Sequence, residues 1–189
     1  MKAKKLQSVG PKPFLKWAGG KRALLPDILS RIPAGPIETY IEPFLGGGAV
    51  FLELAKQGRI SNAVLNDRNP EVIHTWRMVR DEPHRVIEAV GQWTPNEETY
   101  YRIRGLNVDE LSDVERAARV LWLNRTCYNG LYRINRSGQF NVPFGRYKKV
   151  QLVNQENLLA VSEVLQNVTL YEIDFEGIVA MAEIGRAHV

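Results

Sequence analysis

Three consecutive glycines give this chain its clearest candidate ligand site. They lie within residues 37–53 (IETYIEPFLGGGAVFLE), between a β-branched and aromatic run that predicts a short strand and an apolar run that predicts a helix. Gly46, Gly47 and Gly48 lack the Cβ atom that would keep a ligand away from the backbone. The free N–H groups of the helix that begins at Ala49 point into the same turn. A doubly wound α/β fold receives a nucleotide-like ligand at such a strand–turn–helix junction.

A carboxylate stands where this kind of fold would use one. Asp67 ends a second apolar run, residues 63–66, about 20 residues after the glycines, and that is where such folds place the acid that binds ribose hydroxyls. The glycines do not form the G-x-G-x-x-G pattern of dinucleotide-binding proteins. We therefore expect a nucleoside ligand without a pyrophosphate, and S-adenosylmethionine is the common one.

The elements that would position these residues alternate between helix and strand. Pro26 suits the first turn of a short helix ending near Ile32, and the glycine turn with its strand and helix follows. A strand ends at Asn66, and Asn69 caps a helix that runs through Val79. This order predicts an α/β fold with a parallel sheet.

The pattern changes after residue 80. Residues 81–111 are mostly polar, and 100–104 (YYRIR) is the one amphipathic piece that we identify there. Ser112 and Glu115 predict a capping box, followed by a helix to about Arg125. Such a stretch is typical of an insertion into the α/β domain.

The second half of the chain returns to the alternating order. Residues 126–149 hold the turn dipeptides Asn-Gly and Ser-Gly and predict an irregular loop and hairpin. Asn154 predicts the start of a helix, and 168–173 predict a third strand that ends at Asp174. We divide the chain at the following bounds: 1–80 and 151–182 as the α/β part, 81–150 as an inserted domain, and 183–189 as a separate tail.

The positive charges are concentrated in two blocks without acids. The net charge is only +4, but no acidic residue lies between Glu115 and Glu156. That block holds the following eight basic residues: Arg116, Arg119, Arg125, Arg133, Arg136, Arg146, Lys148 and Lys149. It favours a polyanion partner, because phosphate contacts release counterions. The other acid-free block, 1–26, we interpret as a solvated basic face.

Composition excludes several other classes. The chain has 44% hydrophobic and 24% charged residues, as in a soluble globular protein, and no apolar run of membrane-spanning length. Cys127 is the only cysteine, so no intrachain disulfide can form and a reducing compartment is expected. The three histidines show no metal-ligand spacing with one another or with Cys127, so we expect no metal. We expect a monomer rather than an oligomer.

Three stretches together resemble one enzyme family. Residues 14–21 (FLKWAGGK), 42–50 (EPFLGGGAV) and 128–149 (YNGLYRINRSGQFNVPFGRYKK) are similar to the Dam-type, D12 class, DNA adenine-N6 methyltransferases, in the order in which that family carries them. The resemblance implies a class I methyltransferase (Rossmann-like) sheet with an inserted target-recognition domain. It also implies S-adenosylmethionine as cofactor, double-stranded DNA as partner, and the cytoplasm of a bacterial or phage-infected cell.

The resemblance also implies roles for individual residues. The positions that match cofactor contacts in the family are Trp17, Lys21, Phe44, Gly46, Gly48, Asp67, Asp174 and Phe175. The positions that match DNA contacts are Tyr128, Asn129, Leu131, Arg133, Asn141, Pro143, Arg146, Tyr147 and Lys148.

The residue types suit these DNA contacts. Arg133 is the candidate reader of guanine, Leu131 and Pro143 suit a thymine methyl group, and Arg146 or Lys148 suits a phosphate. Tyr128 suits the space left by an extruded base. Because the match extends to family members that read GATC, GATC is the expected site. Longer sites that contain GAT remain open, because related enzymes that read them share much of this stretch.

The family's catalytic motif, Asp-Pro-Pro-Tyr, is missing, since no Pro-Pro occurs in the 189 residues. We therefore predict no catalytic residue here and expect the N-terminal part of a methyltransferase that is inactive by itself. Residues 183–189 resemble the translation of a sequencing-adapter oligonucleotide, and we expect them to be a non-native tail. With fewer strands than the family's sheet, the first strand would be an open edge, which predicts poor solubility or a molten chain.

Alternatives from other classes remain open. The chain could be a catalytically inactive, sequence-specific DNA-binding module that keeps the reader alone. A methyltransferase of RNA or of a small molecule is a third reading, which the acid-free block and the NVPFGR run disfavour. A cytosine-C5 enzyme is disfavoured because Cys127 follows Thr126 and not a proline.

Overall fold

The computed structural model describes residues 10–186, and their side chains as far as Met181. The α-helices are α1 (Leu25–Arg31), α2 (Ala49–Lys56), α3 (Pro70–Asp81), α4 (Pro83–Gly91), α5 (Glu97–Arg104), α6 (Asp113–Thr126), α7 (Gln155–Val164) and α8 (Phe175–Arg186). The strands are β1 (Ile37–Glu42), β2 (Ile60–Asn66) and β3 (Val168–Tyr171). Short 3-10 turns are η1 (Lys21–Leu24), η2 (Val108–Glu110) and η3 (Tyr128–Gly130). Of the expected tail, residues 187–189 lie outside the described part.

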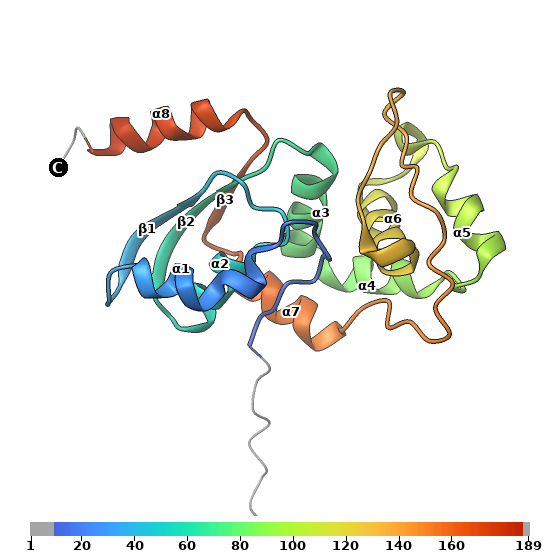
Figure 1. The fold of residues 1–189 in the computed structure, drawn as a ribbon, viewed down its shortest axis with the longest axis horizontal. Helices are drawn as coiled ribbons and strands as arrows, with labels where there is room; N and C mark the ends of the chain where they lie inside the picture. The colour runs from blue at the N-terminus through green and yellow to red at the C-terminus, as the bar shows by residue number, and fades with distance from the viewer. Residues whose placement is uncertain (1–9, 187–189) are drawn as a thin grey trace, which may run out of the picture.

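The three strands form one parallel sheet in the order β1-β2-β3 (Figure 1). Ile37 pairs with Ile60, and Ala63 pairs with Val168. Within the described residues β1 and β3 each pair on one side only, as expected for the first strand. The prediction of a mixed α/β chain with a parallel sheet is confirmed. The carboxyl ends of all three strands meet at one edge, where the glycine turn begins.

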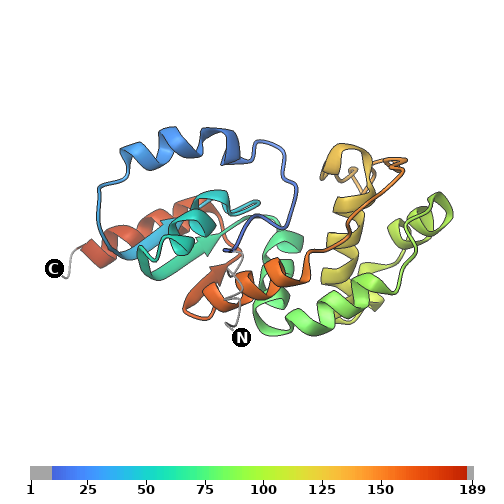
Figure 2. The same cartoon turned by 90° about the horizontal axis from the view of Figure 1, so that it is seen from below.

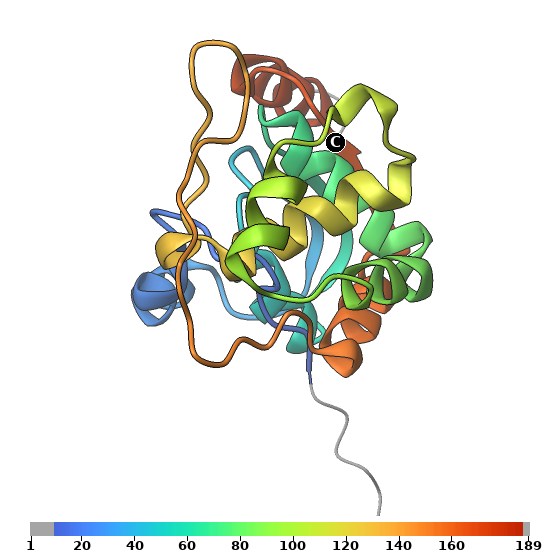
Figure 3. The same cartoon turned by 90° about the vertical axis from the view of Figure 1, so that its right-hand side faces the viewer.

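The helices form a second half beside the sheet. Figure 1 shows β1, β2, β3, α1, α2 and α8 on one side and α4, α5 and α6 on the other, with α3 between them. Figure 2 shows the same molecule from below, with α1 standing off from the sheet. Figure 3, seen from the helical side, shows α4 to α6 in front of the sheet. The segment 126–149 leaves α6 and runs along the outside of this helical half.

One continuous apolar core joins the two halves. Phe14 packs edge-on against Trp76 with ring centroids 4.6 Å apart on the sheet side, and Trp122 and Tyr100 stack at 6.1 Å on the helical side. All four rings are buried in a single cluster. Residues 81–150 therefore pack against α3, mainly by way of α6, and extend the core of the sheet.

The predicted helix starts agree with the observed caps. Asn69 accepts the N–H groups of Glu71 and Val72 at the start of α3. Ser112 and Glu115 form the reciprocal capping box of α6, and the side chain of Asn154 accepts from Asn157 at the start of α7.

Two predictions in the polar stretch and at the third strand were wrong in detail. Helix α4 is a second amphipathic piece within 81–111, and it buries Val86, Ala89 and Val90. These three residues are the buried face of the helix, and the polar residues around them made the helical spacing difficult to recognise in the sequence. Strand β3 ends at Tyr171, before the predicted end, because Ile173 N donates to the side chain of Asn66 and leaves the ladder.

Candidate functional site

The glycine turn has a backbone that only glycine adopts without strain. Gly46 has φ +48° and Gly48 has φ +65°, both in the left-handed region. A Cβ on Gly48 would lie 2.5 Å from Cη2 of Trp76, and one on Gly46 would lie 2.6 Å from Cδ1 of Trp17. Trp76 is completely buried and donates its Nε1–H to Gly46 O at 3.1 Å. The turn is therefore packed directly on two tryptophan rings.

This turn closes one side of a cavity of about 310 Å³, which we call the glycine-turn cavity. Its lining residues are Trp17, Ala18, Gly19, Gly20, Lys21, Phe44, Leu45, Gly46, Gly47, Gly48 and Asp67. Six of the eight predicted cofactor residues are among them, although 14–21 and 42–67 come from separate parts of the chain. Its volume falls in the range of about 300–1,000 Å³ that is usual for small-molecule sites.

Asp67 shapes the cavity as well as lining it. One carboxylate oxygen accepts Gly46 N–H at 2.8 Å, and the other accepts Asn69 N–H at 2.9 Å. The carboxylate thus ties the glycine turn to the start of α3. Each oxygen keeps a further lone pair, so the group can still accept hydroxyl donors from a ligand in the cavity.

Lys21 is held by Glu42, for which no role was predicted. Its Nζ donates to Glu42 Oε1 at 2.8 Å and to Phe44 O at 3.0 Å. Glu42 is buried at the end of β1, and its Oε2 accepts from the Tyr40 hydroxyl at 3.0 Å. Burial, and then the Glu42 carboxylate, raise the pKa of Tyr40 far above its ordinary value. Glu42 is the one residue of β1 classed as buried, and a glutamate in the last position of the predicted strand was the available signal. It was interpreted only as the residue that ends the strand.

Asn66 joins the ends of the three strands and was also missed. It is buried, and its Nδ2 donates to Pro43 O at 3.1 Å and to Ile173 O at 3.0 Å. Its Oδ1 accepts from Ile173 N at 3.0 Å. Leu45 N also donates to the Asn66 carbonyl at 2.8 Å. The loops after β1 and β3 are thereby fixed against the end of β2.

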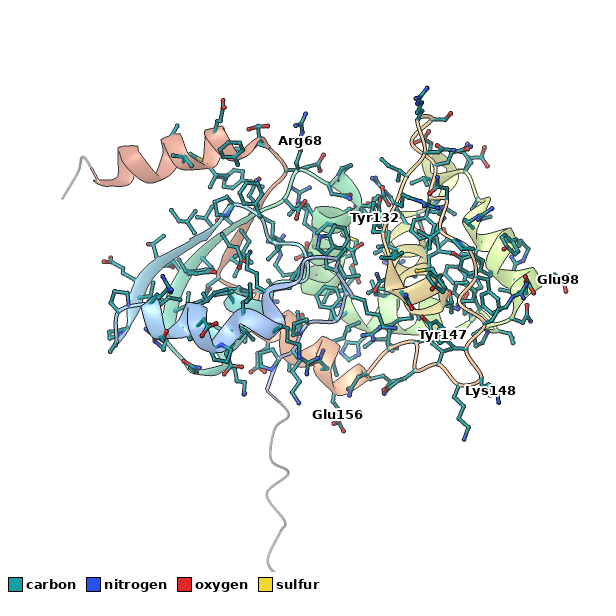
Figure 4. The ribbon with its side chains drawn as sticks, in the orientation of Figure 1. Arg68, Glu98, Tyr132, Tyr147, Lys148 and Glu156 are labelled. Carbon is teal, nitrogen blue, oxygen red and sulfur yellow. The ribbon has the colours of Figure 1, made fainter. Side chains whose placement is uncertain are left out.

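The remaining two predicted cofactor residues lie next to the cavity and do not line it. Phe175 contacts Phe44 with ring centroids 5.6 Å apart, and both rings are exposed. Asp174 is exposed and forms an ion pair with Arg68 at 3.6 Å (Figure 4 labels Arg68).

The start of α2 adds unpaired donors to the turn. Gly48 is its N-cap, and no side chain in the described part of the chain caps the helix. An uncapped helix start carries a partial positive charge and attracts an anionic group such as a carboxylate. The cavity therefore combines an anion-binding backbone with a carboxylate that can bind hydroxyls.

The nine predicted DNA contacts all lie on residues 126–149, which we call the recognition segment. Its base is built by pairing 126–129 with 143–147. Tyr128 N donates to Pro143 O at 2.8 Å, and the Tyr147 hydroxyl accepts from Asn129 N at 3.0 Å and donates to Cys127 O at 3.2 Å. Asn129 and Arg146 both have positive φ, +54° and +52°, which the sequence did not predict. Figure 4 shows Lys148 pointing away from the lower edge of the helical half, whereas Tyr147 lies closer to α6.

The upper part of the recognition segment is the predicted hairpin, joined by isolated bridges rather than by strands. The bridges pair Ile134 with Phe140 and, lower down, Cys127 with Phe144. Arg133 Nε donates to Asn141 Oδ1 at 2.7 Å, and its Nη2 donates to Asn141 O at 3.3 Å. Asn141 therefore holds the guanidinium in one orientation, and the Nη1 side of the fork is left for another partner.

Most of the predicted DNA contacts face solvent. The exposed ones are Tyr128, Asn129, Leu131, Arg133, Pro143, Arg146, Tyr147 and Lys148, and only Asn141 is half-buried. Exposed Tyr128 and Leu131 are large apolar side chains without a core partner. Arg146 pairs with Glu97 at 3.2 Å across two exposed side chains, a contact that costs little to exchange for a phosphate.

Comparisons with known proteins show the family of this chain. Residues 17–189 match the model of the D12 class N6 adenine-specific DNA methyltransferases. The chain belongs to this family. It is 39% identical over 181 residues to the type II methyltransferase M.MjaIII of Methanocaldococcus jannaschii, covering 87% of this chain and 63% of that protein. It is 42% identical over 182 residues to the type II methyltransferase M1.LlaDCHI of Lactococcus lactis subsp. cremoris, covering 92% and 62%.

A third relative bears the name DNA adenine methylase. This Escherichia coli (strain K12) protein is 40% identical over 162 residues, covering 84% of this chain and 56% of its own length. The chain thus spans less than two thirds of the length of these three relatives. The resemblance of the three motifs to the Dam-type enzymes is confirmed.

Two further observations concern other site classes. Among the residues that the structure describes, no group of three or more His, Cys, Asp and Glu side chains is arranged to hold a metal ion. In the same part of the chain, no helix has the length and apolar character needed to cross a membrane. Cys127 is buried, and burial raises the pKa of its thiol to about 11.

Proposed function

We propose that this chain carries the S-adenosylmethionine-binding and DNA-reading parts of a site-specific DNA adenine-N6 methyltransferase. In this proposal β1 to β3 are part of a class I, Rossmann-like sheet, and 81–150 are its inserted target-recognition domain. The observation that carries it is the glycine-turn cavity, which gathers six residues matching cofactor positions directly beside a solvent-exposed, acid-free recognition segment.

The cavity fits S-adenosylmethionine in its chemistry. The uncapped start of α2 and the left-handed glycines suit the carboxylate of the methionine moiety. Asp67 has lone pairs left for ribose hydroxyls, and the exposed rings of Phe44 and Phe175 suit the faces of an adenine. When bound, the cofactor supplies a methyl group on a positively charged sulfur.

The recognition segment suits the major groove of DNA. Arg133 is pre-oriented by Asn141, which lowers the entropy lost when the fork donates to guanine O6 and N7. Leu131 and Pro143 are exposed beside it and suit a thymine methyl group. Arg146 and Lys148 at the base suit phosphates, which fix the register without reading sequence. We propose GATC as the site.

We propose that the 189-residue chain binds both ligands without transferring the methyl group. The amino nitrogen of adenine is a poor nucleophile because its lone pair is delocalised into the ring. In the family, the Asp-Pro-Pro-Tyr motif accepts hydrogen bonds from that nitrogen, and its tyrosine stacks on the flipped base. No Pro-Pro occurs in these 189 residues.

The test measures the two binding steps separately. Calorimetric titration should give S-adenosylmethionine binding to the 189-residue chain, and Asp67→Asn should weaken it about tenfold or more, since a charge-assisted hydrogen bond contributes about 1.5–3 kcal/mol. Asp27→Asn, at an exposed position of α1, is the matched control and should leave the affinity unchanged. Unfolding midpoints without ligand would show whether either change acts through stability.

The DNA step uses labelled duplexes. Fluorescence anisotropy should show tighter binding to a GATC duplex than to one with a single base pair changed, and tritium transfer to either duplex should be absent. Discrimination between the duplexes without any cofactor affinity would favour the catalytically inactive DNA-binding module instead. Equal affinity for all duplexes, or preference for RNA, would contradict the proposed site.

A further inference from the structure

Tyr132 lies where the cofactor half and the DNA-reading half of the chain touch. Its ring is 5.2 Å from the ring of Trp17, which lines the glycine-turn cavity. On its other side it is 5.6 Å from the ring of Phe140, across the hairpin of the recognition segment. Figure 4 labels Tyr132 at the junction of the two halves. It is also the chain neighbour of Arg133, the proposed guanine reader.

Trp17 is itself held against the ligand-binding backbone. The Cβ position of Gly46 lies within 2.6 Å of Cδ1 of Trp17, so the indole packs on the bare turn without a side chain between them. Contact therefore runs without a gap from the glycine turn through Trp17, Tyr132 and Phe140 to the hairpin. A shift of the glycine turn on ligand binding would therefore displace Trp17, and through Tyr132 the hairpin of the recognition segment.

A fixed pivot lies beside this ring pair. Asn124 on α6 is buried, and its Oδ1 accepts from Lys16 N at 2.8 Å while its Nδ2 donates to Lys16 O at 2.8 Å and to Gly130 O at 3.2 Å. The N-terminal stretch and the recognition segment are thus clamped to α6 one residue before Trp17 and two before Tyr132. The two rings are the next contact beyond the clamp.

The hairpin borders open space beyond that pivot. A second cavity, of about 680 Å³, lies beneath it and is lined by Tyr132, Ile134, Phe140 and Asn141 on the hairpin side and by Arg119 and Asn107 opposite. We call it the hairpin cavity. Val142, at the lower end of the hairpin, is held by α5, since its carbonyl accepts from the Tyr100 hydroxyl at 2.8 Å and from Arg104 Nη1 at 3.1 Å. The tip of the hairpin is therefore positioned from its base, where Tyr132 is one of the aromatic anchors.

We propose that Tyr132 is a positioning residue that couples occupancy of the glycine-turn cavity to the orientation of Arg133, so that cofactor and target DNA bind cooperatively. This inference rests on the proposed function, since it needs both ligands. Trp17 and Tyr132 form the wall between the two cavities. A ligand that fixes Trp17 also restricts Tyr132 and the hairpin. Arg133 and Asn141 then lose less conformational entropy when the hairpin binds DNA.

The coupling is measured as a ratio of affinities. The dissociation constant of S-adenosylmethionine is determined by calorimetry for the 189-residue chain alone and saturated with a GATC duplex. Coupling between sites usually amounts to about 5–150-fold, and we expect a ratio of about tenfold. Linkage requires the same ratio for GATC affinity with and without cofactor, which checks the measurement internally.

Four variants separate coupling from folding. Tyr132→Ala and Tyr132→Leu should bring the ratio within about twofold of one, because neither keeps a planar ring against Trp17, and the leucine variant preserves bulk if the alanine variant unfolds. Tyr132→Phe keeps the ring and should keep the ratio. Tyr101→Ala removes an exposed tyrosine from α5, remote from the glycine turn, and is the matched control.

The outcomes are distinct. An unchanged ratio in the folded alanine or leucine variant, or a ratio near one in the unaltered chain that binds both ligands, would overturn the coupling role of Tyr132. A merely structural role would lower both single-ligand affinities and leave the ratio unchanged. Failure of the unaltered chain to bind either ligand would overturn the proposed function, and this inference with it.

Discussion

Replacing Gly48 with alanine should destabilise the chain through two separable effects. Gly48 has φ +65°, and an L-residue in that conformation costs roughly 1–2 kcal/mol. Its Cβ would also lie 2.5 Å from Cη2 and 2.7 Å from Cζ2 of Trp76. Trp76 is fully buried and is held by Phe14 and by its bond to Gly46 O, so it cannot withdraw easily. Overpacking of this kind costs about 1–3 kcal/mol, which gives about 2–5 kcal/mol in total.

Gly58→Ala isolates the backbone effect. Gly58 has the same φ, +65°, and no atom of the described residues lies within 4 Å of its Cβ position. It should lose only the conformational cost of roughly 1–2 kcal/mol. Both changes remove one glycine from the unfolded chain, so the entropic gain in that state cancels in the comparison.

The assay is urea unfolding of both variants at low protein concentration, followed by tryptophan emission. With a slope of about 2 kcal/mol per molar urea, the Gly48 variant should lose about 1–2.5 M in midpoint and the Gly58 variant less than about 1 M. The Gly48 variant should also lose affinity for S-adenosylmethionine, since Gly48 lines the glycine-turn cavity. Equal midpoints for the two variants would refute the reasoning, because the contact with Trp76 would then carry no energy.

Three other changes test separate parts of the structure. Arg133→Ala should cost about 1–3 kcal/mol of discrimination at one base pair in anisotropy titrations, whereas equal loss on every duplex would make it a phosphate contact. Asn66→Ala should lower the free energy of unfolding by about 2–4 kcal/mol, since it removes three hydrogen bonds to part-buried backbone groups of Pro43 and Ile173, and a midpoint unchanged in urea would disprove this. Burial raises the pKa of Cys127 to about 11, so at pH 8 its thiol should react with a disulfide reagent only after unfolding, and rapid native reaction would indicate a molten chain. The open edges of β1 and β3 predict concentration-dependent association in light scattering, against which a monomer with a sharp thermal melt would count.

The elements that the sequence predicted well are those whose signal is local. Caps such as Asn69, Ser112 and Asn154 accept backbone N–H groups within three residues, so a few consecutive residues are enough to predict them. The glycine turn is similar, because its backbone conformation depends on the absence of a side chain at Gly46 and Gly48. Helix α4 was missed because its buried face has only three apolar residues. Those residues are buried partly by packing against α6, which lies more than 20 residues later in the sequence.

The site was predicted less completely, because several of its residues act over long sequence distances. The role of Glu42 at the cavity depends on its ion pair with Lys21, and that pair forms only because residues 14–21 pack against the end of β1. The contact between Trp17 and Tyr132 likewise joins residues more than 100 positions apart. The family resemblance located the recognition segment, but the restraint of Arg133 by Asn141 emerges only when the hairpin is closed.

Two buried asparagines show how irregular functional segments are held on regular elements. Asn66 at the end of β2 and Asn124 near the end of α6 each use both the amide nitrogen and the carbonyl oxygen of one side chain to satisfy backbone groups of other segments. Loops that bind ligands cannot satisfy their own backbone through a ladder, and a buried unpaired group is costly. A fork-shaped amide at the end of a rigid element removes that cost and fixes the loop in place. The glycine turn and the recognition segment can therefore be irregular enough to meet their ligands and still be held in position.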